Sequence, residues 1–162
     1  MELYFFDTTK NDFVNKLHHL LAQHNDTDRS ISKSYTKDAM VLCINRNDWL
    51  IGVDVELKRD RAAEAFEHFA HTFRTFGIKN IPKTIEKLWF YKAWTAMESF
   101  FKLEGKGFGT PKDFILDIER QSIWRNEQEI AWFEYFEISH FLICLCSNKK
   151  FTKERVKIHI SC

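Results

Sequence analysis

The sequence lacks several features that would assign it to a familiar class of protein. No run of about 18 or more apolar residues is present, so we expect no membrane-spanning helix. The formal net charge is only +1, which excludes the strongly basic surface typical of nucleic-acid-binding proteins. The opening residues, MELYFFDTTK, carry an acid at position 2 and only a short apolar run, so they do not predict a secretory signal. Neither a membrane nor a nucleic acid is therefore expected as a partner.

Cysteine pairs of the Cys-x-x-Cys type are also absent, as are close internal repeats, low-complexity tracts and obvious linkers. The four cysteines lie in apolar or terminal stretches, and Cys144 and Cys146 alternate within FLICLCS as buried strand residues do. We therefore expect reduced, structural thiols and a cytoplasmic protein.

Apolar and aromatic residues, in contrast, are plentiful. Of the 162 residues, 44% are hydrophobic and 15% are aromatic, including sixteen Phe and five Trp. A chain of this length is expected to form one domain that buries roughly two-thirds of its unfolded surface. The sequence therefore predicts a well-packed core and excludes intrinsic disorder.

Alternation and helical spacing predict an α+β chain, with strands and helices in both halves. The expected helices cover residues 9–24, 62–77 and 82–104. The expected strands cover residues 2–6, 39–45, 49–57, 113–119, 130–138, 140–147 and 155–161. The polar stretch 25–34 is interpreted as a loop, and the short RND segment between 39–45 and 49–57 predicts a hairpin.

Two carboxylates stand close together in the segment IGVDVEL. Since alternate residues of a strand project from the same face, Asp54 and Glu56 are expected side by side, on one edge of a sheet. Val53 and Val55 would then point into the core. Two like charges held together in this way indicate either a cation-binding site or an ordinary solvated face.

A third carboxylate occurs on the long aromatic helix. Its large apolar side chains form a core stripe at helical spacing, made of Phe90, Trp94, Met97 and Phe101. A second stripe contains Thr95, Glu98 and Lys102. If Glu98 meets Asp54 and Glu56, the three form an all-oxygen cluster that suits Mg²⁺. Lys102 and Lys106 would then face a phosphate carried by the ion. The alternative is an ordinary i, i+4 pair of Glu98 and Lys102, which contributes about 0.2–0.5 kcal/mol.

Together, the two segments resemble a family signature. IGVDVE, followed by FYKAWTAMESFFKLEGKG, is similar to the paired motif of the 4′-phosphopantetheinyl transferases, and more closely to the larger group that includes the surfactin-synthetase-activating enzyme. The matching residues are Gly52, Val53, Asp54, Glu56, Trp94, Thr95, Glu98, Ser99, Lys102, Gly105, Lys106 and Gly107. A third element, SISKS at 30–34, is similar to the Ser-His pair of the family: Ser32 matches, and Lys33 replaces the histidine.

Three departures accompany the resemblance. Lys33 keeps a cation where the family histidine is thought to hold a phosphate of coenzyme A. Met97 replaces the lysine that precedes the helix glutamate in the family, so a Met97→Lys variant is expected to retain or raise activity. Full-size members have two similar halves, whereas only residues 1–51 precede Gly52 in this chain.

For the fold, the resemblance implies a 4′-phosphopantetheinyl transferase-like architecture of two similar lobes, each with a small antiparallel sheet and packed helices. Residues 1–50 would form an abbreviated N-terminal lobe. Residues 51–162 would form a C-terminal lobe that carries the GVDVE and WTAMESFFK motifs, within one compact unit. We expect a monomer, with a dimer as the open alternative.

For function, the resemblance implies transfer of the 4′-phosphopantetheine arm of coenzyme A to a serine of an apo acyl or peptidyl carrier protein, of the holo-[acyl-carrier-protein] synthase type and dependent on Mg²⁺. The implied metal ligands are Asp54, Glu56 and Glu98. The implied catalytic residues are Glu98, as the base, and Lys102. The implied coenzyme A contacts are Ser32, Lys33, Lys102 and Lys106. The alternative is a catalytically impaired relative that binds a carrier protein or coenzyme A, against which the retention of all three acids argues.

Overall fold

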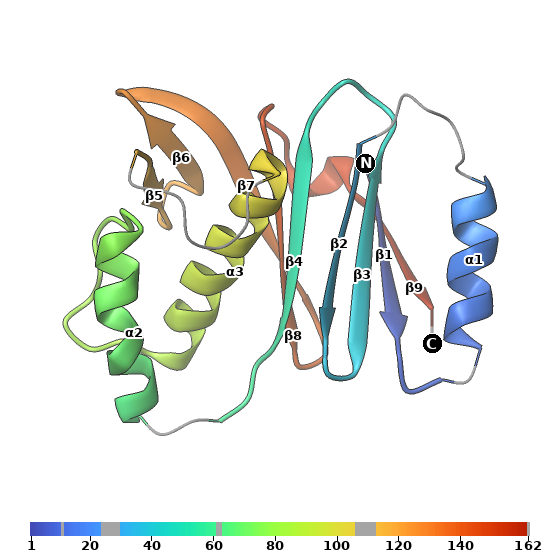
Figure 1. Cartoon of the computed structure of the whole chain (residues 1–162), viewed down its shortest axis with the longest axis horizontal. Coiled ribbons are helices and arrows are strands. Elements are labelled where there is room, and N and C mark those ends of the chain that lie inside the picture. The colour runs from blue at the N-terminus through green and yellow to red at the C-terminus, as the bar shows by residue number, and fades with distance from the viewer. Residues whose placement is uncertain (11, 24–29, 61–62, 106–112, 162) are drawn as a thin grey trace.

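A computed structural model describes residues 1–162 apart from residues 11, 24–29, 61–62, 106–112 and 162. It contains two β-sheets that stand side by side, with helices on their outer sides (Figure 1). The architecture is α+β, which confirms the fold class expected from the sequence. Within the described residues, no helix is both long and apolar enough to cross a membrane.

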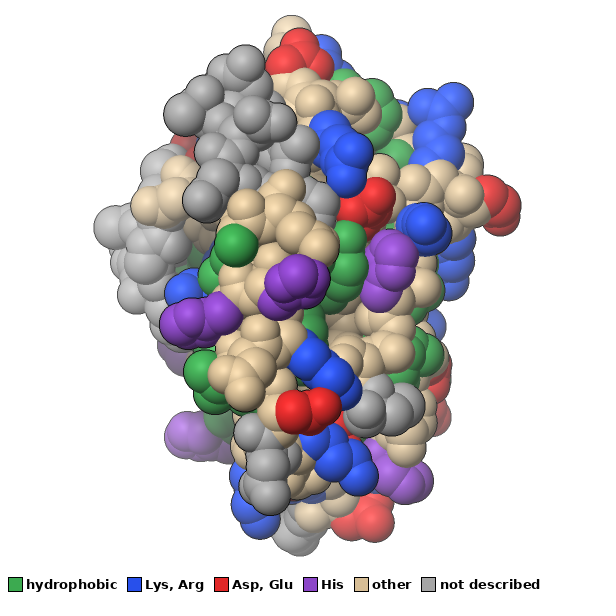
Figure 2. Space-filling view, turned by 90° about the vertical axis from the view of Figure 1, so that its right-hand side faces the viewer, with side chains coloured by type: hydrophobic (Ala, Val, Ile, Leu, Met, Phe, Trp, Pro, Cys, Tyr) green, Lys and Arg blue, Asp and Glu red, His purple; other side chains and the backbone are tan. Residues whose placement is uncertain are grey.

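The first sheet combines three N-terminal strands with the last strand of the chain. Its strands are β1 (Glu2–Asp7), β2 (Ser30–Thr36), β3 (Ala39–Asn45) and β9 (Lys157–Ser161), and they lie side by side in the order β2-β3-β1-β9. Strand β1 pairs antiparallel with β3 and parallel with β9. Helix α1 (Phe13–Gln23) covers the outer face, where Phe13, Leu17 and Leu20 pack against Phe6 and β3. Figure 2 shows this side of the molecule, on which histidine, acidic and basic side chains are interspersed.

The second sheet is antiparallel and carries the other two helices. Its strands are β4 (Ile51–Leu57), β5 (Ile115–Asp117), β6 (Ser122–Arg125), β7 (Gln128–Ile138) and β8 (Phe141–Ser147), and they lie side by side in the order β4-β8-β7-β6-β5. Helix α3 (Lys87–Glu104) packs against β4 and β8, and α2 (Ala63–Thr75) packs against α3 (Figure 1). A short 3₁₀ helix, Lys153–Arg155, leads into β9.

Besides the small cluster under α1, the described residues form two larger apolar cores. One lies between the helices and the second sheet and is rich in aromatic rings, such as those of Phe66, Phe73 and Phe90. The other lies between the two sheets and includes Val53 and Val55 of β4. Strand β4 therefore gives its odd-numbered side chains to the core between the sheets and turns its even-numbered ones toward α3, as alternation predicts.

Two predictions about the N-terminal half are wrong. The segment that begins at Ser30 forms strand β2 rather than a loop, with Ser32 and Ser34 buried. Strands β3 and β4 form no hairpin among the described strands, because β3 pairs with β1 and β2, whereas β4 pairs with β8. The connection between them passes from one sheet to the other. At its start, the side-chain amide of Asn45 donates a hydrogen bond to the Trp49 carbonyl at 3.0 Å. Pairing with distant strands decides the topology here.

The C-terminal half differs from the prediction mainly at element boundaries. Helix α3 begins at Lys87, later than expected, because Glu86 is extended and the buried Ile85 anchors the preceding segment in the core. Strand β6 is an addition to the predicted strands. Thr95 of the second helix stripe is fully buried, and its hydroxyl donates at 2.8 Å to a carbonyl one turn earlier. Both stripes of α3 therefore face protein.

The expected lobe boundary near residue 50 falls between β3 and β4, where the chain passes from the first sheet to the second. Strand β9 returns to the first sheet and pairs with β1. The division into lobes 1–50 and 51–162 remains a prediction.

Candidate functional site

The contact between α3 and β4 positions the predicted acidic residues. Gly52 permits this contact, because a Cβ atom there would lie only 1.9 Å from the carbonyl oxygen of Ser99 and 2.5 Å from the amide nitrogen of Leu103. The helix backbone therefore lies directly on the strand, at a distance that only glycine allows. This crossing determines which helix residues face the strand.

Strand and helix stay in step beyond the crossing. Strand and helix run in opposite directions, and two strand residues advance about 6.6 Å while four helix residues advance about 6 Å, so each alternate residue along β4 faces an earlier part of α3. Two residues after Gly52, Asp54 lies near Glu98, whose titration it affects. Glu56 lines a cavity of about 100 Å³ beside Trp94, one helical turn before Glu98.

Asp54 is buried, with 4% of its surface exposed, and is tied to two other elements. Its Oδ1 accepts hydrogen bonds from Lys102 Nζ at 2.7 Å and from the Ser34 hydroxyl at 2.8 Å. Its Oδ2 is buried and has no hydrogen-bond partner among the described residues. Burial raises the pKa of Asp54, although Lys102, Ser34 and the backbone amide of Val55 act to lower it. The unpaired oxygen is a natural position for another positive group.

Glu98 is partly buried and lies near Asp54. Burial raises the pKa of Glu98, the negative charge of Asp54 raises it further, and Lys102 acts in the opposite direction. The two carboxylates therefore share the Lys102 ammonium, which neutralises one of them. A further cation would stabilise both in the ionised form.

Asp54 and Glu98 fit a hard divalent cation. Carboxylate oxygens are the protein ligands that Mg²⁺ prefers, and the ion usually keeps water or substrate phosphate at its other positions. Asp54 Oδ2 is the buried atom that such an ion would satisfy. Glu56 shares this face of β4, but the described residues include no group of three or more acidic, histidine or cysteine side chains close enough to hold a metal ion. The predicted three-carboxylate cluster is therefore not assembled in this structure, and its closure stays a prediction.

Of the other residues predicted to contact coenzyme A, Ser32 and Lys33 lie on opposite faces of β2. Ser32 is buried, and its hydroxyl accepts a hydrogen bond from the Val53 amide at 2.9 Å, which joins β2 to β4. Lys33 is exposed on the opposite face of β2, with its Nζ 5.8 Å from the centroid of the Tyr35 ring. Lys106 falls outside the described residues. Coenzyme A contacts by these residues remain predictions.

Ser34 is a site residue that the sequence analysis does not identify. Its hydroxyl donates to Asp54 Oδ1 at 2.8 Å and accepts from Lys102 Nζ at 2.8 Å. Ser30, Ser32 and Ser34 alternate along β2 and therefore share one face. That alternation is the signal that would have identified Ser34, once the segment is assigned to a strand.

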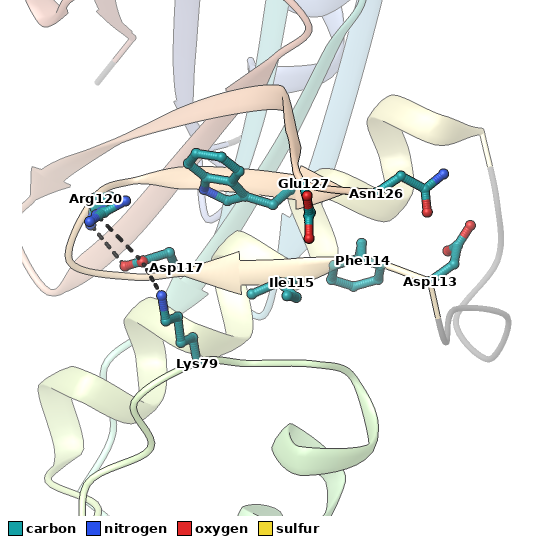
Figure 3. Close-up of a pocket in the computed structure, with 9 residues that line it drawn as sticks. Lys79, Asp113, Phe114, Ile115, Asp117, Arg120, Asn126 and Glu127 are labelled. Atoms are coloured by element: carbon teal, nitrogen blue, oxygen red, sulfur yellow. Dashed lines mark hydrogen bonds and ion pairs between the residues drawn. The ribbon is translucent and has the colours of Figure 1, made fainter.

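A larger cavity, of about 470 Å³, lies elsewhere, over the hairpin of β5 and β6 (Figure 3). At one end of it, Asp117 lies 3.8 Å from Lys79 Nζ and 4.0 Å from Arg120 Nε. None of the described site residues lines this cavity. Asp117 is as buried as Asp54, at 4% exposed, so it provides a comparison for substitutions of the acid site.

Comparison with known proteins assigns the chain to a family. A family model described as "4′-phosphopantetheinyl transferase superfamily" matches residues 50–155, which is more than half of the chain and includes both β4 and α3. No curated protein matches the sequence.

Proposed function

The chain belongs to the 4′-phosphopantetheinyl transferase superfamily, and we propose that it transfers the 4′-phosphopantetheine group of coenzyme A to a serine of an apo acyl or peptidyl carrier protein, with Mg²⁺. The observation that supports this proposal best is the buried Asp54, which lies near Glu98, pairs with Lys102 and has one oxygen without a partner among the described residues. Acids and a lysine in this arrangement suit a pyrophosphate substrate that binds together with a divalent cation.

Three carboxylates would take part in metal binding. Asp54 and Glu98 would hold Mg²⁺, and Glu56 would add a ligand from the same face of β4. When bound, the ion would neutralise charge on the pyrophosphate oxygens. Lys102 would donate to a phosphate oxygen, and Lys33 and Lys106 are candidates for the other phosphates of coenzyme A.

The bond changes are those of a phosphoryl transfer. The serine oxygen of the carrier bonds to the β-phosphorus of coenzyme A, and the bond from that phosphorus to the bridging oxygen breaks, so that adenosine 3′,5′-bisphosphate leaves. The serine proton passes to Glu98, directly or through water. A raised pKa makes the Glu98 carboxylate a stronger base, and general-base help is typically worth about 10²–10⁴ in rate.

Direct modification of a carrier protein tests the proposal. The protein, an apo acyl or peptidyl carrier and coenzyme A are incubated with Mg²⁺, and the intact mass of the carrier is measured. We expect the carrier to gain one phosphopantetheine group, and EDTA to prevent the gain. Asp54→Asn should lower the rate by at least about 100-fold, because it removes charge from the site.

Asp117→Asn is the matched control, since it changes an equally buried aspartate outside the site and should retain activity. A near wild-type rate for Asp54→Asn would refute the assignment of the site. Binding of the carrier without any mass increase would instead indicate a non-catalytic binding module.

A further inference from the structure

Lys102, Ser34 and Asp54 form a closed triangle of hydrogen bonds that joins three elements. Lys102 Nζ of α3 donates to Asp54 Oδ1 of β4 at 2.7 Å and to Ser34 Oγ of β2 at 2.8 Å. Ser34 donates to the same Oδ1 at 2.8 Å. The side-chain contacts of Asp54 therefore converge on one oxygen, and the other oxygen is buried without a partner in the described part of the chain.

We propose that Lys102 is an internal counter-ion, which neutralises Asp54 in the ligand-free protein and is released from it when a divalent cation binds. This inference rests on the proposed function, because it concerns the same acids. It adds that the lysine and the metal ion compete for one carboxylate.

Competition follows from the geometry of the carboxylate. Its two oxygens are bonded to the same carbon, so an ion at Oδ2 of Asp54 would lie only a few ångströms from the ammonium group at Oδ1. Because Asp54 is 4% exposed, water and salt screen the repulsion between these two cations poorly. Binding of the ion is therefore more favourable once the Lys102 ammonium has moved away.

The two partners of Asp54 differ in their freedom to move. The Lys102 side chain is 30% exposed and has a flexible four-carbon stem, so its ammonium group can turn outward. Ser34 is 4% exposed and lies on a strand, so its hydroxyl stays on Asp54 and keeps the carboxylate oriented in both states. The released ammonium then becomes available to a phosphate of the substrate.

This exchange couples the two ligands of the site. A phosphate that attracts Lys102 removes the competitor of the ion, and an ion that displaces Lys102 supplies a cation for the phosphate. By linkage, Mg²⁺ and coenzyme A should each tighten the binding of the other by the same factor. In a protein without the lysine charge at this position, that part of the coupling is lost.

Mg²⁺ binding to the free protein tests the inference without turnover. By isothermal titration calorimetry, Lys102→Met should bind Mg²⁺ at least about tenfold more tightly than the wild type, within the usual range of coupling between sites. Coenzyme A should tighten Mg²⁺ binding by the wild type more than by Lys102→Met. Lys92→Met is the matched control on the same helix, and it should leave both values unchanged, because Lys92 Nζ lies over the Tyr135 ring at 5.5 Å from its centroid.

Equal or weaker Mg²⁺ binding by Lys102→Met would overturn the inference, and so would the absence of binding by both proteins. If Lys102→Met does not fold, Lys102→Gln replaces it with the same expectation, since glutamine can still donate to Asp54 without a charge. If Lys102→Met binds Mg²⁺ more tightly but the wild type modifies no carrier, the counter-ion role stands and the proposed function is refuted. If the wild type modifies a carrier but Lys102→Met binds Mg²⁺ with unchanged affinity, the proposed function stands and the counter-ion role is refuted.

Discussion

The substitution Gly52→Ala tests whether the position of α3 matters to the site, because it displaces the helix without changing any charged residue. The added Cβ atom would lie 1.9 Å from the Ser99 carbonyl oxygen and 2.5 Å from the Leu103 amide nitrogen, whereas ordinary contacts begin at 3.4 Å. Both atoms belong to the backbone inside a helix, so they cannot turn aside as the end of a flexible side chain can. The helix has to withdraw from the strand by about 1.5 Å, which is the difference between the 1.9 Å to the Ser99 oxygen and an ordinary contact of 3.4 Å.

Withdrawal should weaken both the fold and the site. Overpacking of this kind typically costs about 1–3 kcal/mol of the free energy of unfolding. Withdrawal also moves the backbone of Glu98 and Lys102 away from Asp54 by about the same distance, which separates the two carboxylates of the site. A misplacement of about 1 Å in an active site can cost about 10²-fold in rate. We therefore expect Gly52→Ala to modify carrier protein about 100-fold more slowly.

Urea unfolding measures the loss of stability. The initial rate of carrier modification, corrected for the folded fraction, measures the loss of activity. Gly77→Ala is the matched control, because its Cβ atom would lie 2.2 Å from the Phe114 carbonyl oxygen and its φ of 66° adds strain, away from the acids. This variant should lose at least as much stability and retain the rate. A wild-type rate for Gly52→Ala, or equal rate losses in both variants, would show that the crossing does not position the acids.

Two further predictions concern neighbouring residues of α3. Because the pKa of Glu98 is raised above 4.5 in the folded chain, its ionisation lowers stability as the pH rises through the folded value. In EDTA at about pH 7, Glu98→Gln should therefore unfold at a higher urea concentration than the wild type. At about pH 3.5, where Glu98 is protonated, the two proteins should unfold at the same concentration. Equal urea midpoints of the two proteins at both pH values would contradict the prediction. Met97 is fully buried, so Met97→Lys should lower the free energy of unfolding by at least about 2 kcal/mol in urea titrations, because it places a charge in the core. An unchanged midpoint would show that the lysine reaches solvent.

The face of β4 that carries the acids can be predicted from the sequence, whereas the partners of this strand cannot. Val53 and Val55 lie in the core between the sheets, and Asp54 lies on the other face, because the side-chain period of a strand is fixed. The predicted pairing of 39–45 with 49–57 is wrong because it uses only sequence proximity. Strand β3 is buried along its whole length inside the first sheet, and β4 pairs with β8 near the other end of the chain.

The composition of the acid site shows the same limit at the level of single residues. Helical spacing predicts that Glu98 and Lys102 share a stripe of α3, and the crossing at Gly52 brings that stripe to Asp54. The step of one helical turn per two strand residues then takes Glu56 to the preceding turn of the helix, beside a cavity. How closely a third carboxylate approaches the first two depends on this crossing geometry, which no local pattern encodes.

Strand β2 shows why part of the site escapes a motif search. Its pattern is the inverse of the usual one, since Ser32 and Ser34 are buried while Ile31 and Tyr35 are exposed. Apolar side chains mark the buried face of most strands, so this segment is easily assigned to a loop. The inversion has a physical cause: the outward amides of edge strand β4 need acceptors, and serine hydroxyls of β2 supply them where the two backbones do not pair. The same row of hydroxyls ends at Asp54, so the residues that join the two sheets also orient the acid of the site.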